Sequence, residues 1–166
     1  TQPGQAFTPK QIEDSWSPNH EHPPLDKVWS GLVWGLGRHI FDDLLAHRLG
    51  NMLLVAVMTA LLFFMVAEEY GDFAGLGAAG SLLAMPRFFL HAHLAALDVP
   101  IAFMVFLVTF LFWRGVYSRS WKWTLLSGLV WGTALATKVN AFFILPTLFL
   151  WVIIFRRRAY LIVRIF

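Results

Sequence analysis

The segment Leu49–Ala67 most constrains the fold, because it is a long apolar run that contains no charged residue. A helix needs about 20 such residues to cross the hydrocarbon core of a bilayer. A single segment in lipid must satisfy its own backbone hydrogen bonds, and a helix does so. The composition agrees, since 58% of the chain is hydrophobic and only 14% is charged. The sequence therefore predicts an all-α integral membrane protein.

Further apolar segments follow this first one and are separated by short polar breaks. They are Phe73–Leu90, Ile101–Trp113, Trp123–Ala136 and Ala141–Phe155. We therefore expect a polytopic helical bundle of about five transmembrane helices. Pro86 and Arg87 interrupt the second segment, which predicts a kink there. The glycines of that segment indicate close helix packing rather than a phosphate-binding loop. A transporter would predict a charged pair at the midplane or an internal repeat, and the sequence has neither.

The N-terminal part is more polar. Residues 1–25 contain several prolines and no periodicity, so we expect an irregular external loop. Residues 26–45 include apolar residues at spacings of three and four, from Val28 to Ile40. The pattern covers Asp26–Phe41, which is too short and too often interrupted by glycine to span, so it predicts an amphipathic helix that lies in the membrane interface. Residues 46–166 form the membrane region in this division.

The basic residues predict the orientation. Arg114, Arg119 and Lys122 lie in one break, and Arg156–Arg158 follow the last predicted span. With five crossings both groups fall on one side, which the positive-inside rule makes cytoplasmic. The breaks His20–Lys27, His91–Pro100 and Thr137–Asn140 then meet at the external face. We expect a bacterial inner (plasma) membrane protein with its site on that face.

Several charged side chains in or beside these breaks are candidates for binding a phosphate. Lys27, Arg87 and Lys138 are cationic, and ionisable groups near the membrane are functional candidates by default. Lys138 can instead be a lysine that extends from a helix end to water, and Lys27 can be a solvated residue. Asp98 precedes Val99-Pro100, so it is either a helix N-cap or a residue that positions the acceptor or the loop.

Four histidines form two His-x-His pairs, His20 with His22 and His91 with His93. Such pairs are compatible with a divalent metal, but a metal site needs further ligands in a defined geometry, and no spacing supplies them. We therefore assign no metal and keep these residues as alternatives. The absence of cysteine excludes a zinc-thiolate site and a thiol nucleophile. The basic residues are scattered between apolar runs, which argues against nucleic-acid binding.

Three tracts together resemble one family of membrane enzymes. His22-Pro23-Pro24-Leu25 with Lys27 resembles the HPPLxK motif of family 39 glycosyltransferases, which include protein O-mannosyltransferases and aminoarabinose-lipid A transferases. His93–Asp98 is similar to the Arg-x-x-Leu-x-Asp tract of that family, and Gly128–Lys138 is similar to its GLxxGxxxxTK segment. The tracts occur in the family's order.

The resemblance implies a partial GT-C fold and transfer of a sugar from a polyprenyl-phosphate donor to a hydroxyl group. In that reading Lys27, Arg87, His93 and Lys138 contact the donor phosphate, while His22, Pro23, Pro24 and Asp98 shape the site. The expected partners are membrane lipid and the lipid-linked sugar, and no other cofactor is required.

The chain also departs from the family pattern. His93 stands where the family has arginine. The family also has an acidic Asp-Glu pair upstream of its HPPL motif, whereas Glu13-Asp14 has the reverse order and lies close to His22. We therefore assign no catalytic residue and expect the middle of a longer enzyme. The alternative is a non-catalytic relative that packs with other membrane subunits in a larger complex.

Overall fold

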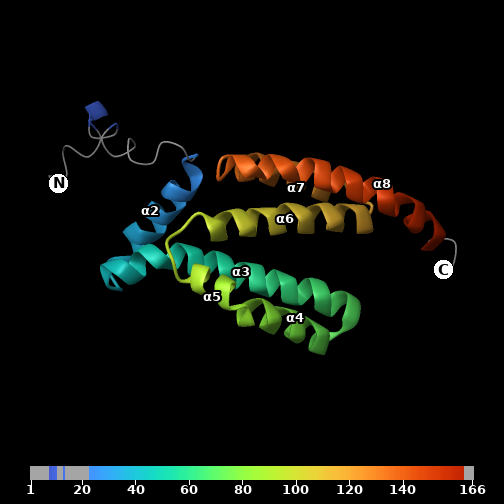
Figure 1. The fold of residues 1–166 in the computed structure, drawn as a ribbon, viewed down its shortest axis with the longest axis horizontal. Coiled ribbons are helices and arrows are strands. Elements are labelled where there is room, and N and C mark those ends of the chain that lie inside the picture. The colour runs from blue at the N-terminus through green and yellow to red at the C-terminus, as the bar shows by residue number, and fades with distance from the viewer. Residues whose placement is uncertain (1–7, 11–12, 14–22, 163–166) are drawn as a thin grey trace.

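The computed structural model describes residues 8–10, 13 and 23–162, with side chains described as far as Ile154. Its helices form a bundle that α2 crosses at one end (Figure 1). They are α2 (Leu25–Gly37), α3 (Asp43–Tyr70), α4 (Asp72–Ala84), α5 (Pro86–Ala92), α6 (Asp98–Tyr117), α7 (Trp121–Leu135), the 3-10 helix η2 (Val139–Phe143) and α8 (Ile144–Ile162). No strand occurs among the described residues. The predicted all-α membrane bundle is confirmed.

Helices lie at each of the predicted spans, but they differ in length. The 28-residue α3 and the 20-residue α6 are long and apolar enough to cross a membrane. Helices α4 and α5 pass the same test together, with a bend of 75° between them. Pro86 is the first residue of α5 and follows Met85 in an extended conformation, so the predicted kink is confirmed. The remaining apolar helices are shorter, with 15 residues in α7. Among the described residues, two helices, or three if the bent pair is one span, could therefore cross a membrane, fewer than the five that we expected.

The junction of α2 and α3 differs from the predicted boundaries. Helix α2 ends at Gly37, and α3 already begins at Asp43, ahead of the expected Leu49. The Asp42 carboxylate accepts a hydrogen bond from the Leu45 backbone N–H at 3.0 Å and caps the helix. Most of the predicted N-terminal loop lies outside the described residues, although Pro9, Lys10 and Glu13 are helical.

Glycine allows a tight hairpin between α3 and α4. Gly71 has φ 86°, a conformation that other residues rarely adopt, and it separates the two helices. A Cβ atom at Gly75 would lie only 2.8 Å from the Phe63 carbonyl oxygen. The close packing expected from the small residues of this segment is therefore present at Gly75.

Helices α6 and α7 form the second hairpin and hold the larger buried cluster. Val108 of α6 and Ala134 of α7 are both buried, and Ala141 and Ile144 complete the cluster. The Ser127 hydroxyl donates a 2.8 Å hydrogen bond to the Val108 carbonyl, which fixes the two helices in register. At the far end of the bundle, Arg114 of α6 forms an ion pair with Glu68 of α3. The C-termini of α3 and α6 therefore lie together.

Helix α8 is longer than the last predicted span. It continues through Arg156–Arg158 to Ile162, whereas we expected the arginines to end it. An α-helix tolerates arginine in its interior, because arginine has a good helix propensity.

Candidate functional site

The three polar breaks meet at one end of the bundle, which we call the site end. The Leu25 backbone N–H at the start of α2 donates a 3.1 Å hydrogen bond to the Ala136 carbonyl after α7. Asp98 at the start of α6 lies beside Lys138, which precedes η2. The predicted convergence of these breaks is confirmed for the described residues.

Asp98 is the centre of this arrangement. One carboxylate oxygen lies 3.6 Å from Lys138 Nζ, and the other lies 3.4 Å from His91 Nδ1. The geometry of the His91 contact does not make a hydrogen bond. The Asp98 side chain is 57% exposed, so it is open to a ligand while its partners are more buried.

The N-cap hypothesis for Asp98 is wrong. Leu97 occupies the N-cap position of α6, and Asp98 is the first helical residue, with no capping hydrogen bond from a side chain at this helix start. Its carboxylate instead faces Lys138 and His91.

Asn51 of α3 fixes the loop between α5 and α6 through two hydrogen bonds. This residue of α3 is only 2% exposed, and its Nδ2 donates to the Leu94 carbonyl at 2.6 Å and to the Ala96 carbonyl at 2.8 Å. Sequence reasoning missed Asn51. Its signal was an amide inside an otherwise apolar span, since a polar group in lipid must find a partner.

Thr137 and Lys138 have different tasks at the end of α7. Thr137 is buried, and its hydroxyl bonds to the Thr133 carbonyl at 3.1 Å. Lys138 leaves the helical conformation, with φ −157° and ψ 133°, and its side chain reaches Asp98. Lys138 therefore has a specific partner in Asp98, which is not expected of a lysine that only extends from a helix end to water.

The other predicted phosphate ligands do not join this ion pair. His93 Nδ1 lies 2.8 Å from the Phe89 carbonyl, and its ring packs on Phe89 at 4.5 Å between centroids. Arg87 is exposed on α5, one helical turn before His91 and on the same face. Lys27 is half-buried in the first turn of α2.

The motif prolines stand directly before α2. Pro24 is its N-cap residue, and Pro23 precedes it. His20 and His22 lie outside the described residues. Within the described ranges, no group of three or more histidine, cysteine or acidic residues could hold a metal ion. His91 and Asp98 alone are too few ligands for the usual metal site.

Asp26 is an unexpected feature of the HPPLxK-like motif. One carboxylate oxygen is buried, and it has no hydrogen-bond partner among the described residues. Burial raises the pKa of Asp26 above its ordinary value of 3.8, because water no longer stabilises the charged form.

This raised pKa has a consequence for stability. The folded state holds the Asp26 proton more tightly than the unfolded state does, so Asp26 destabilises the fold increasingly as the pH rises through the folded pKa. Asp26→Asn should therefore give a higher Tm than the wild type at pH 7 and a similar Tm below pH 3.8. Thermal unfolding across pH measures this difference. Asp72→Asn, in the exposed first turn of α4, is the matched control. A constant difference between Asp26→Asn and wild type at every pH would contradict the assignment.

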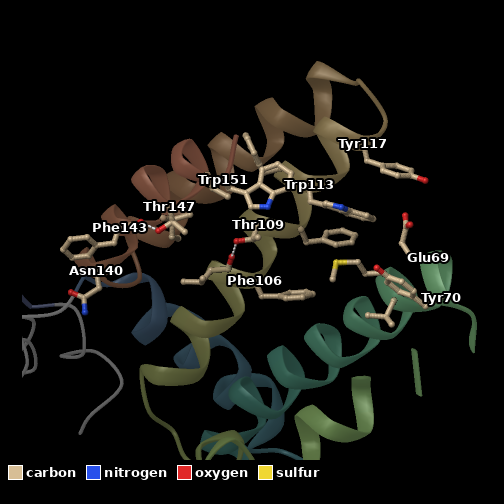
Figure 2. A pocket seen from close by; sticks show the side chains of 17 residues that line it. Glu69, Tyr70, Phe106, Thr109, Trp113, Tyr117, Asn140, Phe143, Thr147 and Trp151 are labelled. Atoms are coloured by element: carbon tan, nitrogen blue, oxygen red, sulfur yellow. Dashed lines mark hydrogen bonds between the residues drawn. The ribbon is translucent and has the colours of Figure 1, made fainter. Parts of the chain in front are cut away.

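An apolar pocket of about 660 Å³ lies between α3, α6, η2 and α8 (Figure 2). Asn140 and Phe143 lie at one end, whereas Glu69, Tyr70 and Tyr117 lie at the other. The middle is lined mainly by aromatic and aliphatic side chains. Asn140 is two residues after Lys138, so the pocket begins just below the site end.

Comparison with known proteins agrees with this geometry. The chain matches the model of the dolichyl-phosphate-mannose-protein mannosyltransferase family over residues 22–165. The chain belongs to this family. No curated protein and no solved structure matches it. The matched range includes His93, Asp98 and Lys138, so the resemblance expected from the sequence is confirmed. The family consists of membrane glycosyltransferases of the mannosyltransferase type.

Proposed function

We propose that the chain forms the donor-binding part of an enzyme that transfers a sugar from a polyprenyl phosphate to an acceptor hydroxyl. The observation that carries the proposal is Asp98, which lies between Lys138 and His91 where three breaks of the chain meet. The carboxylate of Asp98 holds the positive charge of Lys138 in a fixed position. Such a charge suits a phosphate attached to a lipid.

In the reaction, the bond between the anomeric carbon and the phosphate oxygen breaks, and a bond to the acceptor oxygen forms. The acceptor loses a proton to a base, and the departing phosphate gains negative charge. Lys138 stabilises that charge, and Asp98 positions Lys138. Arg87 and Lys27 are further candidate phosphate ligands, since they come from the elements that border the site end.

We also propose that the site end faces the outside of a bacterial inner membrane. Arg114 lies at the C-terminal end of α6, and Arg119 and Lys122 lie in and beside the turn that follows, opposite Asp98. The positive-inside rule favours a cytoplasmic location for these residues.

Helix α2 supports the proposed division into an external segment, an interfacial helix and a membrane region. Its Val28, Leu32 and Leu36 follow at intervals of four, and each is more than half exposed. A neighbouring face buries Val33 and Gly37, and the indole of Trp29 donates to the Gly50 carbonyl of α3 at 3.1 Å. A helix with one apolar face open and the other packed suits the membrane interface.

Asp98→Asn tests the function. It removes the charge that holds Lys138 but keeps the shape of the side chain, so we expect sugar transfer by the intact protein to fall by roughly 10- to 100-fold. The KM for the donor and the pH dependence of transfer should both change, which loss of fold alone would not produce. Asp72→Asn is the control, because Asp72 also lies in a helical first turn but at the far end. Unchanged transfer by Asp98→Asn would refute the site.

A non-catalytic membrane subunit is the second candidate, and His93 favours it. This residue stands at the position of the family's arginine, and its ring is bound to its own helix through Phe89. An intact wild-type protein that binds the polyprenyl-phosphate sugar and transfers none of it would establish this second function.

A further inference from the structure

We propose that the corner where α2 meets α3 binds the headgroup of phosphatidylethanolamine, a phospholipid that carries a phosphate and a primary ammonium. The corner consists of the end of α2, the turn of residues 38–42 and the first turn of α3, and it protrudes at one edge of the bundle (Figure 1). Its side chains have no part in the proposed sugar transfer, so the inference adds a second, separate surface to the protein.

The length of α3 places this corner at the level of the lipid headgroups. Helix α3 has 28 residues and begins at Asp43, so it is about 42 Å long at the rise of an α-helix. A bilayer is about 40–45 Å thick when its headgroup layers are included. The first residue of α3 therefore lies among the headgroups and not in the hydrocarbon.

Large apolar side chains surround the polar residues of the corner. Leu36, Ile40, Phe41 and Leu44 are between 43% and 78% exposed, so the other helices do not cover them. Apolar side chains at this depth insert below the headgroups and hold the segment in the membrane interface. The polar side chains of the corner are thereby kept next to lipid headgroups.

A cation and a carboxylate lie beside one indole ring in this corner. The guanidinium carbon of Arg38 lies 4.9 Å from the centre of the Trp34 ring. Asp43 Oδ1 accepts a 2.8 Å hydrogen bond from Trp34 Nε1, and His47 stacks on the same ring at 5.2 Å between centroids. Within the described part of the chain, neither Arg38 nor Asp43 forms an ion pair. Trp34 therefore holds two opposite charges close together without neutralising them.

These two charges complement a zwitterionic headgroup. Arg38 is exposed, and a guanidinium can donate two hydrogen bonds to one phosphate. Asp43 is also exposed, and a carboxylate that accepts one hydrogen bond can accept more. The ammonium of phosphatidylethanolamine is two carbons away from its phosphate ester and has N–H groups to donate. Both contacts are charge-assisted hydrogen bonds, which are the stronger kind.

Two other common headgroups fit this surface less well. The quaternary ammonium of phosphatidylcholine has no N–H for Asp43, and it binds best to free aromatic faces. The Trp34 ring already contacts Arg38 and His47. Phosphatidylglycerol is an anion that offers no cation to Asp43, and Asp42 adds a second carboxylate next to it. The surface therefore selects the primary ammonium.

Photolabelling of the intact protein in phosphatidylcholine vesicles tests the proposal. The probes are trace amounts of phosphatidylethanolamine and phosphatidylcholine with the same photoreactive group on an acyl chain, next to the glycerol. We expect the ethanolamine probe to label the peptide of residues 36–44 about tenfold more than the choline probe does. Unlabelled phosphatidylethanolamine should compete, whereas phosphatidylglycerol and polyprenyl phosphate should not. Equal labelling by the two probes, or displacement by either anionic lipid, would overturn the proposal.

Two variants test the charges separately. Asp43→Asn keeps an oxygen that accepts from Trp34 but removes the charge, so ethanolamine labelling should fall to the level of the choline probe. Arg38→Gln should lower labelling by both probes, because both headgroups contain the phosphate. Asp72→Asn and Lys122→Gln change exposed residues at the other end of the bundle and should label as the wild type does. Unchanged labelling in both corner variants would refute the site.

Two further measurements separate this site from the fold and from the proposed enzyme. Asp43→Asn should keep the Tm of the wild type in detergent, since its amide oxygen still accepts from Trp34. Asp98→Asn should keep the full ethanolamine preference, because Asp98 lies at the start of α6 and not in this corner. Loss of the preference in Asp98→Asn would contradict the assignment to the corner. Sugar transfer without any ethanolamine preference would leave the enzyme standing and the lipid site refuted.

Discussion

Lys138→Ala is expected to lower sugar transfer by the intact protein by roughly 100-fold or more, the range seen when a group that stabilises developing charge is removed. Lys138 Nζ lies 3.6 Å from Asp98 Oδ1 at the site end, so its charge is held in place before the donor binds. Its loss also leaves the Asp98 carboxylate next to the departing phosphate, and like charges repel. The loss should fall chiefly on kcat, because negative charge on the phosphate grows in the transition state.

The fold should survive this change. The Asp98 side chain is 57% exposed, and partly exposed ion pairs contribute little to stability. Lys122→Ala removes an exposed lysine from the other end of α7 and should transfer sugar as the wild type does. Lys138→Arg keeps the charge and should recover part of the activity. Full activity of Lys138→Ala would show that Lys138 is only a helix-end lysine.

Asn51→Leu is expected to destabilise the protein by about 2–4 kcal/mol and to impair the site as well. The amide of Asn51 donates to the carbonyls of Leu94 and Ala96, and leucine would leave both carbonyls without this donor. These carbonyls lie in the loop that leads to Asp98. Thermal unfolding should therefore show a lower Tm, and the KM for the donor should rise in the protein that remains folded.

Thr59→Val is the control for Asn51→Leu. Thr59 also lies in α3, and its buried hydroxyl has no hydrogen-bond partner among the described residues. Removal of an unsatisfied hydroxyl at constant shape should be neutral or stabilising. A similar loss of stability in both variants would mean that the Asn51 hydrogen bonds are not the cause.

The helices and their breaks could be predicted from the sequence, because lipid leaves a chain few choices. The charge-free run in α3 and the Pro86 kink were both readable, since they depend on neighbouring residues. The start of α3 was misplaced, because hydropathy alone set the boundary at Leu49 and the Asp42 cap was overlooked. The extension of α8 through Arg156–Arg158 was missed because charge was taken as a stop signal.

The sequence predicted which residues belong to the candidate site, but not which of them are in contact. The order of the family motifs pointed to Asp98 and Lys138. The expected five crossings placed the two polar breaks that contain them at the same face of the membrane. His91 and His93 were treated alike as alternatives for a metal site, yet His91 turns to Asp98 while His93 turns to the Phe89 carbonyl. Helical geometry separates them, because residues two apart lie on different faces of a helix.

The sequence by itself determined that this is a helical membrane protein of a sugar-transferring family, because hydropathy and motif spacing are local properties. Only the tertiary structure decided that Asp98 holds Lys138, that Asn51 supports their loop and that a pocket leads away from them. These contacts join residues far apart in the chain, and several end on backbone carbonyls, which are the same in every residue type. A polar residue in an apolar span indicates that a partner exists, but only the packing of the helices shows which carbonyl it is.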